Sequence, residues 1–409
     1  MISPMNPIQK RSYRSIIASN CFIRIGDALS DPKTSLTWLL TSLGAPAFAV
    51  SLLVPIRESG SMLPQILLAN FIQKFSKRKP IYVFGLIAQF LAIISIGIAA
   101  LTLSPLTAGY LAMVSLAVFA GARAFCSITS KDILGRAIPK GSRGKLSGTA
   151  AMLSGIFATI LAIVLLSSRD HQDTSTLASI IIFAGCMWLL AGIAYHFVDE
   201  KAEKTNASKP KQGIKTRLAL VKNDPLFRNF IIARTLLLGS SLASPIYVVM
   251  AHQAQQEPSA DSLIAFIVAG ALATALSSHI WGKFSDKASH LCLFLGGLLA
   301  ALIGFISIIV FYFLPDLAAL PYTWPVMFFL FNIGYMGVRL GRTTWVVDAA
   351  EGDKRTDYVA SSNTIIAAFI LVLGLIAAPL QVLNPMYSMS LYTICCLVGA
   401  WMALRIKIS

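Results

Sequence analysis

The stretch NCFIRIGDALSDPK, Asn20 to Lys33, places charged side chains inside an apolar run that is long enough to cross a membrane. A helix needs ~20 residues to span a hydrocarbon core of ~30 Å. Asn20, Arg24, Asp27 and Asp31 follow one another at i, i+4, i+7 and i+11, so they form one polar stripe along the helix. A charge at mid-membrane costs ~2.5–3.5 kcal/mol, so we expect this stripe to face protein or water, with the rest of the chain around it.

The composition is that of a membrane protein with many spans. Of the 409 residues 56% are hydrophobic and 13% charged, and the mean hydropathy is +0.72. A water-soluble fold of this composition would not stay in solution. The sequence predicts an all-α membrane protein with twelve transmembrane helices, at residues 14–40, 47–72, 80–101, 108–128, 146–167, 176–197, 227–252, 262–281, 290–314, 322–341, 359–382 and 386–404.

The placement of the basic residues explains the net charge of +16 without a nucleic acid partner. With the N-terminus inside, only Arg169 of the 34 Lys and Arg residues falls in a predicted outer loop, and six fall within spans. This bias predicts a multi-pass protein of the cell (inner or plasma) membrane with both termini in the cytoplasm. The basic N-terminal segment precedes a full span, so no cleavable signal peptide is expected.

A hydrophilic segment at 199–223 divides the predicted spans into two sets of six. We therefore expect an N-terminal bundle at 1–198, a cytoplasmic linker at 199–223 and a C-terminal bundle at 224–409. The two halves also match in sequence: GDALSDP at 26–32 aligns with GSSLASP at 239–245, and KFS recurs after the second and eighth spans. Arg123 precedes Asp132 by nine residues in the fourth span, as Arg339 precedes Asp348 in the tenth. These matches favour a duplicated, pseudo-symmetric six-helix unit.

The six cysteines lie in predicted spans without the spacing of metal ligands, so neither a disulfide framework nor a metal site is expected. No cofactor is predicted. The chain also lacks the Gly-Lys-Ser/Thr loop that binds nucleotide phosphates.

The segment WGKFSDK at 281–287 resembles the signature loop of the major facilitator superfamily (MFS), with Gly282, Asp286 and Lys287 at the matching positions. The glycine would permit a tight turn, the acid would accept from a helix N-terminus and the cation would pair with it. The corresponding first copy, at 73–78, lacks both Gly and Asp. Arg123 is similar to the basic residue of the family's fourth span. The resemblance implies two six-helix bundles that rock about a central site.

Nine charged residues lie within the predicted spans, and exposing all of them to lipid would cost ~20 kcal/mol. Asp27, Arg57 and Glu58 lie near the midplane, where a functional role is favoured over a structural ion pair. Arg24 either orients Asp27 or touches substrate. Asp31 is expected in a wet vestibule nearer the outer surface.

Two further pairs are predicted near the cytoplasmic face. Arg123 with Asp132, and Arg339 with Asp348, are favoured as gate or interface pairs rather than as substrate ligands.

The sequence favours a secondary active transporter that works by alternating access, is proton-coupled and is monomeric. Asp27 and Glu58 would carry the proton, because the second bundle has no acid within its spans. Drug or metabolite efflux by proton antiport is an alternative, although the glycine and proline signature of such antiporters is not matched in the fifth span. A non-transporting receptor and an integral-membrane enzyme are the other classes, and no catalytic constellation supports an enzyme.

The charge balance bears on the substrate. Six cations less three anions leave the intramembrane region at +3. Arginine cannot shed its proton, and a carboxylate or phosphate would satisfy it bidentately. We therefore expect an anionic or zwitterionic small solute, with Arg57 and Arg234 as its ligands from the two bundles.

Overall fold

In the computed structural model the regular secondary structure of the described residues is all helical, and these residues are 6–64, 68, 71–72, 75–137, 174–200, 221, 223–254, 260–349 and 352–407. The chain forms two compact units. The first comprises Met1–Asp31, Leu43–Ala45 and Ile56–Lys211, and the second comprises Pro32–Ser42, Pro46–Pro55 and Gln212–Ser409.

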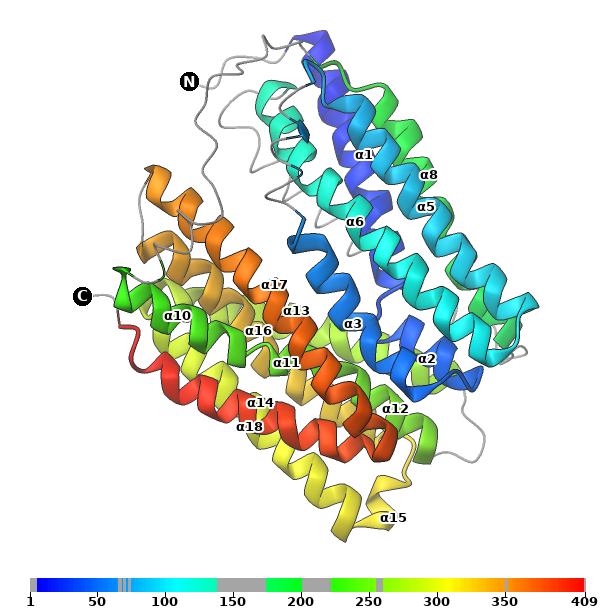
Figure 1. Ribbon diagram of the computed structural model, residues 1–409, viewed down its shortest axis with the longest axis vertical. Coiled ribbons are helices and arrows are strands. Elements are labelled where there is room, and N and C mark those ends of the chain that lie inside the picture. The colour runs from blue at the N-terminus through cyan, green and yellow to red at the C-terminus, as the bar shows by residue number, and fades with distance from the viewer. Residues whose placement is uncertain are drawn as a thin grey trace. The chain divides into compact units, whose positions relative to one another are not determined.

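The first unit is built from α1 (Pro7–Leu29), α5 (Lys79–Thr102), α6 (Pro105–Ala137) and α8 (Thr174–His196), together with the later part of α3 (Ala47–Met62). Helix α5 packs against α6 and α8, and α8 also packs against α1 (Figure 1). The large side chains that α5 and α6 leave exposed, such as Phe84, Leu91 and Val114, are apolar, as expected for surfaces that face lipid.

The second unit contains the earlier part of α3 and ten further helices, among which α14 packs against α16 and α18, and α10 packs against α17 and α18. An aromatic core lies at one end, where Phe230 stacks on Trp345 with ring centroids 3.9 Å apart. The bounds are α2 (Ser35–Ser42), α10 (Pro225–Leu236), α11 (Gly239–Leu242), α12 (Ser244–Ala254), α13 (Ala260–Lys287), α14 (Ser289–Phe313), α15 (Pro315–Ala318), α16 (Thr323–Ala349), α17 (Gly352–Leu383) and α18 (Pro385–Ala403).

Eight of the twelve predicted spans are confirmed, because eight helical segments of the described chain are long and apolar enough to cross a membrane. The tenth predicted span, at 322–341, falls on α16, which is not among those eight. The first predicted span is divided between α1 and α2, and the second, α3, ends at Met62, short of its predicted bound. The fifth predicted span, at 146–167, lies outside the described residues.

The two sequence repeats break their helices at the same position. In the first repeat α1 ends at Leu29, before Asp31 and Pro32, and in the second α11 ends at Leu242, before Pro245. Proline lacks an amide hydrogen, and its ring clashes with the preceding turn, so a helix ends or kinks before it. By contrast, α3 continues through Pro55 and Gly60 and ends before Pro64.

The glycine that opens each repeat lets two helices approach closely. A Cβ atom on Gly26 would lie 2.8 Å from the Trp188 ring and 3.1 Å from the Ala184 carbonyl oxygen, both on α8. A Cβ atom on Gly239 would lie 2.7 Å from the Tyr392 carbonyl oxygen on α18. Thus the last described helix of each unit packs on the glycine at the start of its repeat.

The signature-like segment at 281–287 does not form the expected turn. Helix α13 continues through it to Lys287, and α14 begins at Ser289, so only Ala288 separates the two helices. Gly282 lies within the helix and has open space where a Cβ atom would stand. No proline interrupts the segment, and the Trp281 indole nitrogen donates to the Ile333 carbonyl oxygen at 2.9 Å, which holds this end of α13 against α16.

Candidate functional site

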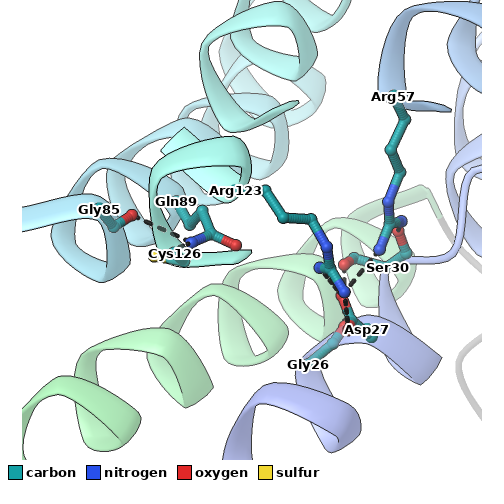
Figure 2. A network of polar contacts seen from close by, with 8 residues as sticks. All are labelled: Gly26, Asp27, Ser30, Arg57, Gly85, Gln89, Arg123 and Cys126. Atoms are coloured by element: carbon teal, nitrogen blue, oxygen red, sulfur yellow. Dashed lines mark hydrogen bonds and ion pairs between the residues drawn. The ribbon is translucent and has the colours of Figure 1, made fainter. Parts of the chain in front are cut away.

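Asp27 is the centre of a charged network in the first unit (Figure 2). Arg123 of α6 grips both carboxylate oxygens, with Nη1–Oδ1 at 2.5 Å and Nη2–Oδ2 at 2.6 Å. Arg57 of α3 donates from Nη2 to Oδ1 at 2.7 Å. One carboxylate thus holds two guanidinium groups from two other helices. The Arg123 contact is the bidentate fork that gives arginine–carboxylate pairs their strength and fixed geometry.

The same network includes the end of α1. Arg57 donates from Nη1 to the Ser30 carbonyl oxygen at 3.0 Å, and the Ser30 hydroxyl donates to the Gly26 carbonyl oxygen at 2.8 Å. The last carbonyls of a helix have no partner within it, and a cation there also interacts favourably with the helix dipole. Arg57 therefore ties the point at which the first repeat breaks to the Asp27 carboxylate.

An aromatic pair flanks both arginines. The guanidinium carbons of Arg57 and Arg123 lie 5.1 Å and 5.8 Å from the centroid of the Phe119 ring, within the range of cation–π attraction. Phe119 in turn meets Trp188 edge to face, with ring centroids 5.1 Å apart. Trp188 is the residue that packs on Gly26, next to Asp27. Both rings are fully buried, so the two arginines are supported by a packed aromatic pair.

The network is partly open rather than sealed. The side chains of Arg57, Asp27 and Arg123 are 12%, 22% and 33% exposed. Next to it Gln89 donates to the Gly85 carbonyl oxygen at 3.1 Å and contacts the Cys126 sulfur at 3.2 Å (Figure 2). These neutral contacts satisfy a buried amide on α5 and add no charge.

The other residues predicted for the site surround this network at different depths. Arg24 is exposed and acts on Asp27 only electrostatically, and Glu58 acts on Arg123 in the same way. Asp31 is half-buried just beyond the break of α1. Among these candidates the structure brings Arg57 into direct contact with Asp27.

The partner of Arg123 in the structure was not predicted from the sequence. We had predicted a pair with Asp132, which is nine residues along the same helix. The structure places its guanidinium on Asp27, 96 residues earlier in the chain. The side chain of Asp132 lies outside the described residues. The only available signal was that Arg123 and Asp27 both lie within apolar spans, where opposite charges tend to pair.

The structure does not test the second predicted gate pair, Arg339 with Asp348. Arg339 is exposed on α16, and the side chain of Asp348 lies outside the described residues. Within the signature-like segment Lys287 is exposed, and the side chain of Asp286 is likewise outside the described residues.

Arg234 differs from the arginines of the first unit because its described partners are neutral. It is 9% exposed, near the end of α10. Nη1 donates to the Ser362 hydroxyl at 3.0 Å and Nη2 to the Asn363 side-chain oxygen at 3.2 Å, both on α17. The buried Nε has no hydrogen-bond partner among the described residues.

A buried acid that the sequence analysis missed lies at the predicted cytoplasmic end of the first unit. Glu200 accepts from the backbone nitrogens of Arg78 and Lys79 at 2.8 Å each, at the start of α5. Lys79 donates to the carbonyl oxygens of His196 and Val198, just after α8. The loop before α5 lacks the acid of the signature motif, and Glu200, 122 residues later, caps this helix instead.

Solved structures support the same architecture at low sequence identity. The E. coli fucose:proton symporter FucP (N162A) matches with a TM-score of 0.57 and 15% identity, covering 97% of this chain and 98% of that one. A POT family transporter in complex with a thioalcohol-conjugated peptide matches with a TM-score of 0.71 and 12% identity, covering 97% and 96%. A POT family transporter in complex with 5-aminolevulinic acid matches with a TM-score of 0.71 and 11% identity, again covering 97% of this chain and 96% of that one. No curated protein sequence matches the chain.

The family model described as Major Facilitator Superfamily matches residues 16–379, which is most of the chain and includes Asp27, Arg57, Arg123 and Arg234. Together with the helical fold, the broken first and seventh spans and the charged residues within them, this match identifies a multi-pass membrane transporter. The chain belongs to the major facilitator superfamily.

Proposed function

We propose that the protein is a proton-coupled secondary transporter of a small anionic or zwitterionic solute, and that it works by alternating access. The observation that carries the proposal is the Asp27 carboxylate, which holds Arg57 and Arg123 within the predicted membrane span. A charged side chain within a membrane span costs free energy, so its presence there favours a functional role. Intramembrane carboxylates commonly relay protons.

Asp27 can couple a proton to movement because its partners compete with that proton. Both guanidinium groups favour the charged carboxylate. A proton binds readily only when the arginines move away, and their return expels it. Because Arg57 also holds the Ser30 carbonyl, such a movement would change the contacts at the end of α1. Glu58, next to Arg57 on α3, is the second proposed proton carrier.

The substrate class follows from the excess of positive charge. Arg57 and Arg123 share the Asp27 carboxylate, so these three directly bonded side chains carry one net positive charge, which a bound anion would balance. We propose Arg57 as the ligand in the first unit, because it makes one bond to Asp27 whereas Arg123 makes two. Arg234 is the proposed ligand in the second unit. Arg24 is proposed either to orient Asp27 or to touch the substrate, and Asp31 is proposed to lie in a wet vestibule nearer the outer surface.

The remaining proposals concern architecture. We assign the moving bodies to residues 1–198 and 224–409, joined by a linker at 199–223. The protein is proposed to lie in the inner or plasma membrane of the cell, with both termini in the cytoplasm. The gate residues are proposed to be Arg123, Asp132, Gly282, Asp286, Lys287, Arg339 and Asp348. A fucose:proton symporter among proteins of this fold is consistent with proton coupling.

Uptake into proteoliposomes tests the proposal directly. Purified protein would be reconstituted and offered labelled organic acids, amino acids, sugar phosphates and cationic drugs, with and without an inward proton gradient. We expect gradient-dependent accumulation of one of the anionic or zwitterionic groups. Movement of cationic drugs alone would support proton antiport of drugs instead, and no movement of any compound would argue against transport.

A further inference from the structure

Arg234 carries a positive charge that the described part of the second unit does not balance. Its two hydrogen-bond acceptors, the Ser362 hydroxyl and the Asn363 amide oxygen, are neutral. Neutral acceptors satisfy donors but contribute no negative charge. Arginine stays protonated in proteins, so this charge cannot be removed by loss of a proton.

A second arginine adds to the same charge. Phe230 of α10 stacks on Trp345 of α16, which brings the two helices together. Arg234 lies one turn after Phe230, and Arg342 lies one turn before Trp345, so the two cations are on facing stretches. Arg342 is near enough to act on Arg234 electrostatically. Like charges in a poorly solvated region repel each other, which raises the free energy of the empty site.

The unused donors of Arg234 indicate where an anion would bind. A guanidinium has five N–H donors, and the described contacts use one on Nη1 and one on Nη2. Nε is buried and unpaired, and leaving such a group unsatisfied costs about 1–3 kcal/mol. Since Ser362 and Asn363 accept from the two Nη atoms, Nε is the donor of this guanidinium that an incoming oxygen would satisfy.

The position of Arg234 near the end of α10 offers a structural explanation, but a weaker one. A helix C-terminus stabilises a cation only modestly. This is less than the cost of placing one arginine in the hydrocarbon region, even before the repulsion from Arg342. The helix end therefore reduces the cost of this charge without removing it.

We propose that Arg234 forms an oxyanion subsite, in which Ser362 and Asn363 position its guanidinium and Arg342 adds attraction, and that this subsite binds a carboxylate or phosphate group of the transported solute. The inference rests on the proposed function, because it assigns the acidic group of the substrate to one set of side chains. It also separates two roles: Arg234 binds the anion, whereas Asn363 acts through Arg234.

Thermal unfolding of the purified, detergent-solubilised protein tests the subsite without requiring transport. The probes are acetate, succinate and inorganic phosphate, titrated at constant ionic strength. We expect saturable stabilisation of the wild type by at least one of them. Arg234→Gln should abolish it, and Arg234→Lys and Asn363→Ala should weaken the apparent affinity roughly 10-fold or more, as expected when a charge-assisted hydrogen bond is lost or misdirected.

Arg228→Gln is the matched control. Arg228 lies on the same helix, six residues earlier, but is exposed, so its loss should leave the anion effect unchanged. Without probe, Arg234→Gln should be as stable as the wild type or more stable, since an unbalanced buried charge has been removed. A clear loss of stability in Arg234→Gln, together with no anion effect in the wild type, would show a structural arginine and overturn the proposal.

Two further outcomes are decisive. Stabilisation that depends on Arg234 and appears only with phosphatidylglycerol, and not with the soluble anions, would assign the charge to a lipid headgroup and overturn the link to the solute. Uptake in proteoliposomes keeps the two proposals apart. Proton-driven uptake by a wild type that shows no Arg234-dependent anion effect would refute the subsite alone, whereas absence of uptake would refute the proposed function.

Discussion

The two units differ in the partners of their buried arginines. In the first unit two arginines from different helices meet on the carboxylate of Asp27. In the second unit Arg234 is more deeply buried, yet its described contacts are a hydroxyl and an amide oxygen. The repeat position of Asp27 is occupied by Ser240, whose hydroxyl bonds to the Leu237 carbonyl oxygen of its own chain segment.

This difference favours proton coupling in the first unit and anion binding in the second. A carboxylate that holds two arginines can exchange one of them for a proton, so the first unit is suited to coupling. An arginine with neutral partners and an unused donor is suited to binding an acidic group. The shared helix breaks and glycine contacts show that the scaffold is common to both units, and that the difference lies in a few charged side chains.

The largest effect is expected from Asp27→Asn. The change leaves Arg57 and Arg123 without their shared charge partner. Breaking a buried pair costs about 3–5 kcal/mol, and we expect about 3 kcal/mol here because the groups are partly exposed. Thermal unfolding should show the loss, and Asp27→Glu should recover part of it. Unchanged stability in Asp27→Asn would mean that the pairs do not hold the first unit together.

The same substitution in each unit sharpens the comparison. Arg123→Lys replaces a fork on a carboxylate by a single bond and should cost about 2 kcal/mol of stability. Arg234→Lys alters hydrogen bonds to two neutral oxygens, so it should cost less stability than Arg123→Lys. Both variants would be measured side by side by thermal unfolding in one detergent. A larger loss in Arg234→Lys would reverse the assignment of roles.

The repeat glycines test whether the scaffold and the site can be separated. Gly26→Ala and Gly239→Ala each force a Cβ atom against a neighbouring helix, and each should cost about 1–2 kcal/mol. Only Gly26→Ala displaces an adjacent acid, so only that variant should also reduce proton-driven uptake by correctly folded protein. Gly121→Ala, where nothing lies within 4 Å of the new Cβ atom, is the control and should be neutral or slightly stabilising. Equal uptake by the two repeat variants would contradict this account.

The smallest effect is expected at Glu200, whose carboxylate accepts from the first backbone nitrogens of α5 in the first unit. Glu200→Gln should cost about 1 kcal/mol, because a charged cap becomes a neutral one. Gradient-driven uptake per folded molecule should stay the same, since Glu200 lies outside the Asp27 network. A loss of coupling without a loss of stability would assign Glu200 a role in transport.

Much of the fold could be predicted from hydropathy and charge placement, because apolar runs of membrane length leave few alternatives. The helix breaks after Leu29 and Leu242 were not predicted, because the sequence analysis treated 14–40 and 227–252 as continuous spans, although each repeat carries a proline that could have indicated them. The partner of Arg123 could not be predicted in this way. That contact joins α6 to α1 and depends on how far each helix is rotated, which periodicity within one helix does not specify.

Local motifs failed for a related reason. Gly282 resembled a turn residue, but α13 continues through it, and the Trp281 indole nitrogen donates to the Ile333 carbonyl oxygen of α16. Glu200 compensates for an acid missing from the loop before α5, and no spacing rule connects residues 122 apart. In each case the outcome was decided by contacts between segments distant in sequence.

The central claim is that acids of the first unit, Asp27 above all, couple the proton to transport. The most direct test compares wild type with the double variant Asp27→Asn, Glu58→Gln in proteoliposomes, using a solute that the wild type accumulates. We predict that the variant no longer accumulates solute in a proton gradient but still exchanges labelled for unlabelled solute across the membrane. Accumulation that survives in the double variant would contradict the claim and place the coupling site elsewhere.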